Sequence, residues 1–148
     1  MGLDARYRLA DYRGVTLATP NESEAAQAAG FEIRDERDLA RAATTLRQRL
    51  GASHLIVTRG RDGLTLWNRR AVSLRAWGDE EAVDVTGAGD AVIATATLAL
   101  AAGAPALEAA ALADVAGSVA VGQRGAVPVS TADLVRALLI LTIPVAAW

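Results

Sequence analysis

The chain has 148 residues, of which 52% are hydrophobic, and its formal net charge at pH 7 is −2. A chain of this length and composition is predicted to form a single globular domain, because it can bury a substantial apolar core. The near-neutral charge gives no electrostatic reason to expect binding to nucleic acid or to a membrane surface. All 15 basic residues are Arg, which excludes a Walker A phosphate loop because that loop requires a lysine.

The chain contains no cysteine and a single histidine, His54. Disulfides, thiolate metal sites and sites built from several imidazoles are therefore excluded. The N-terminal residues are charged from Asp4 onward and do not resemble a signal peptide, so a cytoplasmic protein is expected.

Hydrophobic periodicity and Gly or Pro punctuation divide the chain into short elements. The elements predicted first are a strand at 15–18, helices at about 22–29 and 36–50, a buried strand at 55–57, and a hairpin of 63–67 with 71–76. Three helices follow: one after Gly89 that ends near 103, one at about 105–121, and a last one opened by the capping box of Ser130 and Asp133. This order predicts an α/β domain with helices packed on a sheet. The helix after Gly89 carries no charge beyond Asp90 and is predicted to be buried against that sheet.

The most informative segment is 84–90, which reads Asp-Val-Thr-Gly-Ala-Gly-Asp and precedes an uncharged helical run. Backbone N–H groups at the start of a helix attract phosphate and other anions, because the helix dipole makes this end positive. The N–H groups of Ala88, Gly89 and Asp90 are candidates to stabilise a transferring phosphoryl group. The Asp90 carboxylate is a candidate base for a hydroxyl proton. The alternative is a strand-to-helix turn in which Asp90 only complements the helix dipole.

Two further motifs precede this loop. Asn21 and Glu24 have the spacing of a local capping arrangement; the functional alternative is that Glu24 holds a hydrated Mg²⁺ while Asn21 reaches a phosphate. The segment 58–63, Thr-Arg-Gly-Arg-Asp-Gly, follows a buried strand, and ligands of open α/β sheets collect at the carboxyl ends of strands. It is interpreted either as a Gly-rich turn into a hairpin or as part of a ligand site. Arg59 and Arg61 within it are interpreted as solvated surface charges rather than phosphate ligands.

In this order, the three motifs resemble the C-terminal part of the ribokinase-like sugar kinases, the PfkB carbohydrate kinase family. Segment 84–90 is similar to a signature of that family. Asn21 with Glu24 matches its Asn-x-x-Glu motif, and Thr58, Gly60 and Gly63 match its Thr-x-Gly-x-x-Gly motif. The surrounding residues are most similar to the heptose 7-phosphate kinase domain of bacterial ADP-heptose synthases. The resemblance implies a ribokinase-like (Rossmann-like) layered α/β/α fold, with 1–148 as a single partial domain, the C-terminal nucleotide-binding half.

The resemblance also implies a role for each matched residue, with ATP and Mg²⁺ as cofactors. Asp90 is expected to be the catalytic base, and the anion hole is expected to consist of Gly87, Ala88 and Gly89. The residues expected to bind the nucleotide are Asn21, Thr58, Gly60, Gly63 and Asp114. The residues expected to bind cations are Glu24 for Mg²⁺, through water, and Asp84 and Thr86 for a monovalent cation such as K⁺. Two positions depart from the pattern: Asp114 replaces an Asn common in the adenine-side helix, and Gln123 replaces a Lys.

Kinases of this family are considerably longer, and their sugar site lies mainly in the N-terminal half. The chain is therefore expected to pair with another chain, either an N-terminal half or a second copy of itself, because an isolated half exposes a sheet edge. The leading hypothesis is ATP-dependent phosphorylation of a sugar or sugar phosphate, with D-glycero-D-manno-heptose 7-phosphate as the nearest substrate. One alternative is another sugar kinase of the family, such as a ribokinase or fructokinase. The other is a truncated, non-catalytic nucleotide-binding or assembly module.

Overall fold

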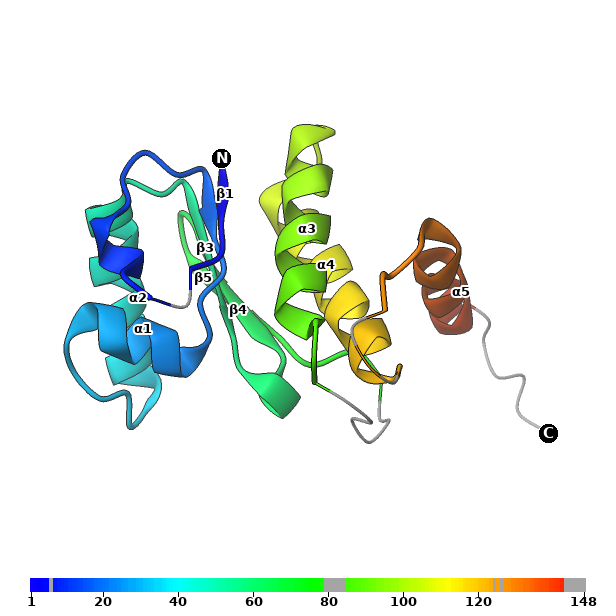
Figure 1. The fold of residues 1–148 in the computed structure, drawn as a ribbon, viewed down its shortest axis with the longest axis horizontal. Helices are drawn as coiled ribbons and strands as arrows, with labels where there is room; N and C mark the ends of the chain where they lie inside the picture. Colours follow the sequence, from blue (N-terminus) through cyan, green and yellow to red (C-terminus); the bar gives the residue numbers. More distant parts are fainter. Residues whose placement is uncertain (6, 79–84, 124, 126, 143–148) are drawn as a thin grey trace.

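The computed structural model describes residues 1–5, 7–78, 85–123, 125 and 127–142 (Figure 1). The strands are β1 (Gly2–Leu3), β2 (Leu17–Ala18), β3 (His54–Thr58), β4 (Leu64–Trp67) and β5 (Ala71–Leu74). The helices are α1 (Glu22–Ala29), α2 (Glu36–Leu50), α3 (Ala88–Ala101), α4 (Ala106–Val121) and α5 (Thr131–Thr142), with 3₁₀ turns η1 (Leu9–Asp11) and η2 (Gly60–Asp62). The predicted elements are all present, and the first strand is shorter than its apolar run suggested because only 17–18 pair with neighbours.

The strands form one mixed sheet in the order β1-β2-β3-β4-β5. β1, β2 and β3 are parallel, whereas β4 and β5 continue the sheet as an antiparallel meander. In the meander Thr58 lies opposite Leu64, which in turn lies opposite Leu74. Two reversals make β5 run in the direction of β3, so β1, β2, β3 and β5 all end at the same edge of the sheet. This carboxyl edge is where an open α/β sheet holds its ligands.

Helices cover both faces of the sheet, with α1 and α2 on one side and α3 and α4 on the other (Figure 1). The side chains of β3 contribute to the hydrophobic cores on both faces of the sheet, because successive side chains of a strand point to opposite faces. Leu55 and Val57 lie in the cluster under α1 and α2, and Ile56 lies in the cluster under α3 and α4. The predicted layered α/β/α class is therefore confirmed. None of the helices in the described part of the chain is long and apolar enough to span a bilayer.

α3 packs tightly against β1 and α4 because glycines face it. A Cβ on Gly2 would lie 2.4 Å from the Oγ1 atom of Thr97, and a Cβ on Gly117 would lie 2.9 Å from a methyl group of Val92. Real Cβ atoms do not approach so closely, so both glycines are required for this packing. The start of α3 is thereby held beside the carboxyl edge of the sheet.

The prediction that α3 is buried holds for one side of the helix only. Val92 and Ala96 are buried against the sheet, but Leu98 is 71% exposed. The described residues cover only the faces toward β1 and α4. The uncharged sequence of α3 therefore reflects an apolar stripe that the described part of the chain leaves open to solvent.

Candidate functional site

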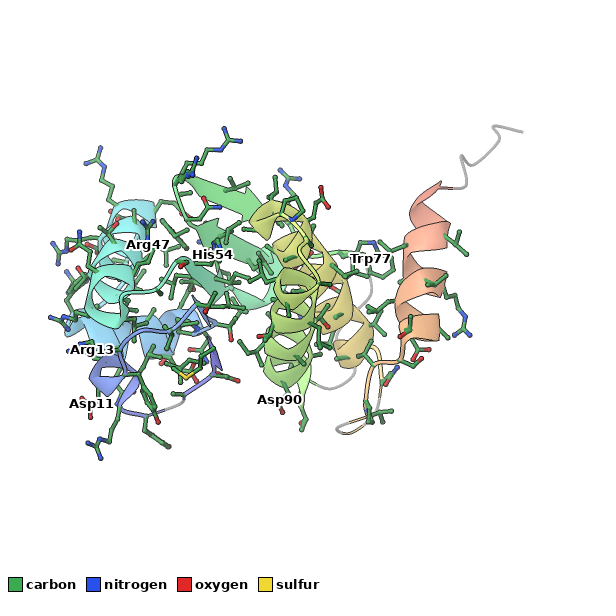
Figure 2. All side chains as sticks on the ribbon, turned by 90° about the horizontal axis from the view of Figure 1, so that it is seen from above. Asp11, Arg13, Arg47, His54, Trp77 and Asp90 are labelled. Atoms are coloured by element: carbon green, nitrogen blue, oxygen red, sulfur yellow. The ribbon has the colours of Figure 1, made fainter. Side chains whose placement is uncertain are left out.

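The first turn of α3 begins without a side-chain cap from its N-cap residue. Gly87 precedes the helix in the left-handed conformation, with φ 84°, and as a glycine it offers no side-chain acceptor to the first N–H groups. The N–H of Ala88 donates to the carbonyl oxygen of Val85 at 3.4 Å, whereas those of Gly89 and Asp90 have no acceptor within the helix. Figure 2 shows Asp90 pointing outward from this turn, and its side chain is exposed. A carboxylate thus stands beside backbone donors.

A second carboxylate lies close to the same turn. Asp4 directly follows β1, and its Oδ2 atom is 4.0 Å from the position that a Cβ on Gly89 would take. The sequence reasoning missed Asp4 as a site residue. The available signal was its place immediately after a parallel strand, at the carboxyl edge where ligands bind. Two carboxylates beside one anion-binding turn repel a phosphate unless a cation neutralises them.

The motif at 21–24 forms the predicted cap of α1. The Asn21 side chain accepts from the backbone N–H of Glu24 at 2.8 Å, and the Glu24 carboxylate accepts from the backbone N–H of Asn21 at 3.0 Å. Both side chains are therefore engaged locally, although a carboxylate and an amide oxygen retain further lone pairs. Asn21 also pairs with Thr58 in an isolated parallel bridge, and the N–H of Thr58 donates to the carbonyl oxygen of Pro20. The structure thus brings two of the three motifs together.

The segment 58–63 joins β3 to β4 as a turn closed by its own backbone. The N–H of Arg59 donates to the carbonyl oxygen of Gly63, and the N–H of Gly63 donates to that of Gly60. A Cβ on Gly63 would lie 2.2 Å from the carbonyl oxygen of Leu74, whereas nothing lies within 4 Å of a Cβ on Gly60. Gly63 is therefore required for the close approach of β5, while Gly60 stands in open space.

Arg59 is a structural ion-pair centre rather than the solvated charge expected from the sequence. Its Nε atom is 2.7 Å from Glu22 and its terminal nitrogen is 2.6 Å from Glu36, with 17% of the side chain exposed. The hydrogen bond to Glu22 is the main cause that raises the pKa of Arg59. Arg59 links the turn to both α1 and α2. The interpretation of Arg61 as an exposed residue is consistent with its surroundings.

Two hollows share Arg75, and one of them adjoins this turn. A polar hollow of about 620 Å³ is lined by Glu36, Arg59, Arg61, Asp62, Arg75, Ala76 and Gly78. A second hollow, of about 560 Å³, lies between the end of β5, α4 and α5. Its walls are mainly apolar and include Leu74, Leu112, Val115 and Leu138. We call this second hollow the apolar cavity.

Asp114 is one of two carboxyl groups of α4 that line the apolar cavity, the other being Glu108. Trp77, which lies between α4 and α5, also lines it (Figure 2). Burial raises the pKa of Asp114 to about 6, and a hydrogen bond from the backbone N–H of Trp77 partly opposes this rise. The indole Nε1 of Trp77 is buried and has no hydrogen-bond partner among the described residues. The cavity therefore combines apolar walls with the carboxyl groups of Asp114 and Glu108 and the guanidinium group of Arg75.

Metal-binding groups are sparse in the described part of the chain. No cluster of three or more His, Cys, Asp or Glu side chains there could enclose a metal ion. Separate carboxylates are nevertheless compatible with Mg²⁺, which keeps several waters and binds through one or two carboxylates and the substrate phosphates. Glu24, Asp4 and Asp90 are among the carboxylates at the carboxyl edge. Asp84, expected to bind a monovalent cation with Thr86, lies outside the described residues, and Thr86 lies just before α3.

A family model described as pfkB family carbohydrate kinase matches residues 4–132. The bifunctional protein HldE of Pelobacter propionicus is 39% identical over 128 residues, which cover 86% of this chain and 26% of that protein. The chain spans about a quarter of the length of the curated relatives it matches.

Solved structures show the same fold. A structure of Arabidopsis thaliana ribokinase complexed with ribose and ATP is 23% identical with a TM-score of 0.75, covering 83% of this chain and 40% of that one. Escherichia coli phosphofructokinase-2 in complex with potassium is 24% identical with a TM-score of 0.79, covering 91% of this chain and 43% of that one. At these identities the likeness establishes the ribokinase-like fold.

Proposed function

The chain belongs to the pfkB family of carbohydrate kinases, and from that premise we propose that it supplies the nucleotide site, anion hole and catalytic base of a sugar kinase. The observation that carries the proposal is the first turn of α3, where uncapped backbone N–H groups adjoin the exposed Asp90 at the carboxyl edge of the sheet. The proposed reaction transfers the γ-phosphoryl group of ATP to a hydroxyl of a sugar or sugar phosphate.

Each part of this turn has one task in the proposed transfer. The substrate hydroxyl oxygen bonds to the γ-phosphorus while the bond to the β-γ bridging oxygen breaks and ADP leaves. Asp90 accepts the hydroxyl proton as the new bond forms. The N–H groups of Gly87, Ala88 and Gly89 are proposed to form the anion hole, since donors at a helix start stabilise charge on the transferred group.

The carboxylates around the turn are proposed to act with a cation. A bound Mg²⁺ would supply positive charge that stabilises the negative charge on the phosphate groups. Glu24 and Asp4 would hold its hydration shell, because water-mediated binding leaves the Glu24 capping bond intact. Thr86 and Asp84 are retained as the proposed monovalent-cation ligands.

The acceptor is proposed to be D-glycero-D-manno-heptose 7-phosphate, giving the 1,7-bisphosphate, since the sequence around the motifs resembles the kinase domain of ADP-heptose synthases. The sugar would be presented by a companion half. Two features support such a partner: β1 is an edge strand, and the matched solved chains are more than twice as long as their matched part. A cytoplasmic location is proposed with this function, because ATP serves as the phosphoryl donor.

The role of Asp90 is tested by Asp90→Asn, which keeps the shape of the side chain but cannot accept the proton. Turnover is measured with Mg-ATP and heptose 7-phosphate, ribose or fructose, using the 148-residue chain together with a sugar-binding N-terminal half. We expect kcat to fall by about 100-fold or more, with little change in the KM for ATP because the backbone donors remain.

Asp11→Asn is the matched control, because Asp11 is an exposed residue of η1 whose ion pair with Arg8 lies on the surface. It should turn over like the wild type. An Asp90→Asn variant that folds and retains full turnover would remove Asp90 from the chemistry. Comparing turnover with heptose 7-phosphate, ribose and fructose distinguishes a heptose kinase from a ribokinase or fructokinase.

A second candidate function is a non-catalytic nucleotide-binding module. It is favoured by the short share of the relatives that the chain spans. Calorimetry with Mg-ATP on the chain alone, followed by the phosphorylation assay, distinguishes the two. Nucleotide binding without turnover in any assembly supports the module, and turnover by the chain alone refutes it. A complete failure to bind nucleotide contradicts both.

A further inference from the structure

The apolar cavity has the composition of a slot for a flat heterocycle. Ligand sites are mainly apolar with a few polar groups that set orientation, and their volumes are about 300–1,000 Å³. The cavity, at about 560 Å³, falls within this range. Its polar groups include the Asp114 carboxyl, and the ring of Trp77 forms part of its wall.

The cavity shares a wall residue with the polar hollow at the turn that is proposed to bind the nucleotide. Arg75 lines both the apolar cavity and the polar hollow that contains Arg59, Arg61 and Asp62. Leu74, at the end of β5, is in register with Leu64 next to that turn. The apolar cavity and the polar hollow therefore share a wall beside the end of β5.

The chemistry of a carboxyl group differs for the two purine bases. A carboxylate only accepts hydrogen bonds, and guanine offers two adjacent donors, its N1–H and N2–H₂ groups. Adenine offers the N6–H₂ donor next to the N1 lone pair, which faces a carboxylate oxygen unfavourably. A protonated carboxyl reverses this match, because its O–H donates to adenine N1 while its other oxygen accepts from N6–H₂. An Asn at this position would match adenine at every pH for the same reason.

On the basis of the proposed function, we propose that Asp114 contacts the base of the nucleotide and determines which base is preferred. With Asp114 ionised, the site binds GTP more tightly than ATP. With Asp114 protonated, the site binds ATP more tightly than GTP. ATP remains a donor under this proposal, and GTP becomes a second one. The residue that departs from the sugar-kinase pattern thus becomes the determinant of base preference.

The direction of the pH effect follows from the environment of Asp114. Burial raises its pKa to about 6, so the carboxylate prevails above that pH and the neutral acid below it. The other charged side chains that line the cavity are Arg75, after β5, and Glu108, on the same helix. α5 contributes the apolar Leu138. Preference for GTP should therefore decline as the pH falls through about 6.

The test is calorimetric titration of the 148-residue chain with Mg-ATP and with Mg-GTP, at one pH well above 6 and one below it. The measured quantity is the ratio of the two Kd values, in which the titration of the phosphates cancels. Wild type should prefer GTP at the higher pH and lose this preference at the lower pH. Asp114→Asn should prefer ATP at both, changing the ratio by about tenfold or more, as expected for one bidentate base contact.

Asp11→Asn is the matched control, since Asp11 is an exposed residue of η1 that lines neither hollow. Its ratio and its pH dependence should equal those of wild type. If both nucleotides bind and Asp114→Asn leaves the ratio unchanged, the inference is wrong while the proposed nucleotide site stands. If neither nucleotide binds wild type, the proposed nucleotide site fails and the inference fails with it.

Discussion

At the scale of single residues, residues of the same type within one motif have different structural roles. Gly60 and Gly63 both have positive φ, 57° and 83°, yet only Gly63 is enclosed by backbone atoms of the next strand. Arg59 and Arg61 are one residue apart, yet Arg59 ties two helices to the turn while Arg61 borders the polar hollow. A motif identifies the positions, and the contacts decide what each one does.

The first prediction concerns these two glycines. Gly63→Ala should destabilise the chain by more than about 2 kcal/mol, because the new methyl meets the carbonyl oxygen of Leu74 and the φ is unfavourable. Gly60→Ala should cost only about 1–2 kcal/mol, the penalty of the left-handed conformation alone. Urea unfolding of both variants measures the difference. Equal losses would show that the approach of β5 does not constrain Gly63.

At the scale of elements, the ends of helices explain most of the agreement between sequence and structure. α1 begins at the capping box of Asn21 and Glu24 and ends at Gly30, and α2 ends at Gly51, with both glycines left-handed. Capping interactions join residues within one helical turn, so they can be recognised from the sequence. The same box, however, occupies a position at the end of β2 where a ligand can bind. Capping and ligand binding are compatible there.

The second prediction separates these two roles of Asn21. Asn21→Ser should preserve the stability of the chain, because serine is an equally good N-cap, whereas Asn21→Ala should lose about 1 kcal/mol. If the amide of Asn21 contacts a phosphate, Asn21→Ser should also weaken Mg-ATP binding. Urea unfolding and calorimetry on the same samples measure both effects. Wild-type affinity in Asn21→Ser would restrict Asn21 to capping.

At the scale of the whole molecule, the three layers are complete for the sheet but not for α3. α1 and α2 bury one face of the sheet and α3 with α4 the other (Figure 1). The side of α3 that carries Leu98 has no covering element among the described residues, and another side of the same helix packs on β1, which is an edge strand. An apolar helix face beside an edge strand is typical of a surface that meets another chain.

The third prediction tests this surface as the contact with the sugar-binding half. Leu98→Lys should leave the free energy of unfolding within about 0.5 kcal/mol of wild type, because the side chain is already exposed. It should nevertheless weaken association with the companion half in sedimentation velocity experiments. Val135→Lys, on the exposed side of α5, is the control and should associate normally. Unchanged association of Leu98→Lys with the companion half would place the contact elsewhere. Sedimentation velocity of the chain alone measures whether the chain forms a homodimer.

The sequence by itself determined the order and most of the bounds of the elements from β2 onward, the α/β class, and the first turn of α3 with Asp90. These depend on periodicity, caps and glycines, which act between residues a few positions apart. It also predicted family membership, because the three motifs occur in a fixed order that the family match bears out.

Only the tertiary structure decided which distant groups meet. Asp4 beside Gly89, Arg59 between Glu22 and Glu36, and Asp114 at the backbone of Trp77 join residues far apart in the chain. It also decided that α3 is buried on one side only, since burial depends on which elements surround a helix rather than on its composition. Contacts across the sheet depend on strand order and register, and a single sequence does not specify these through local patterns.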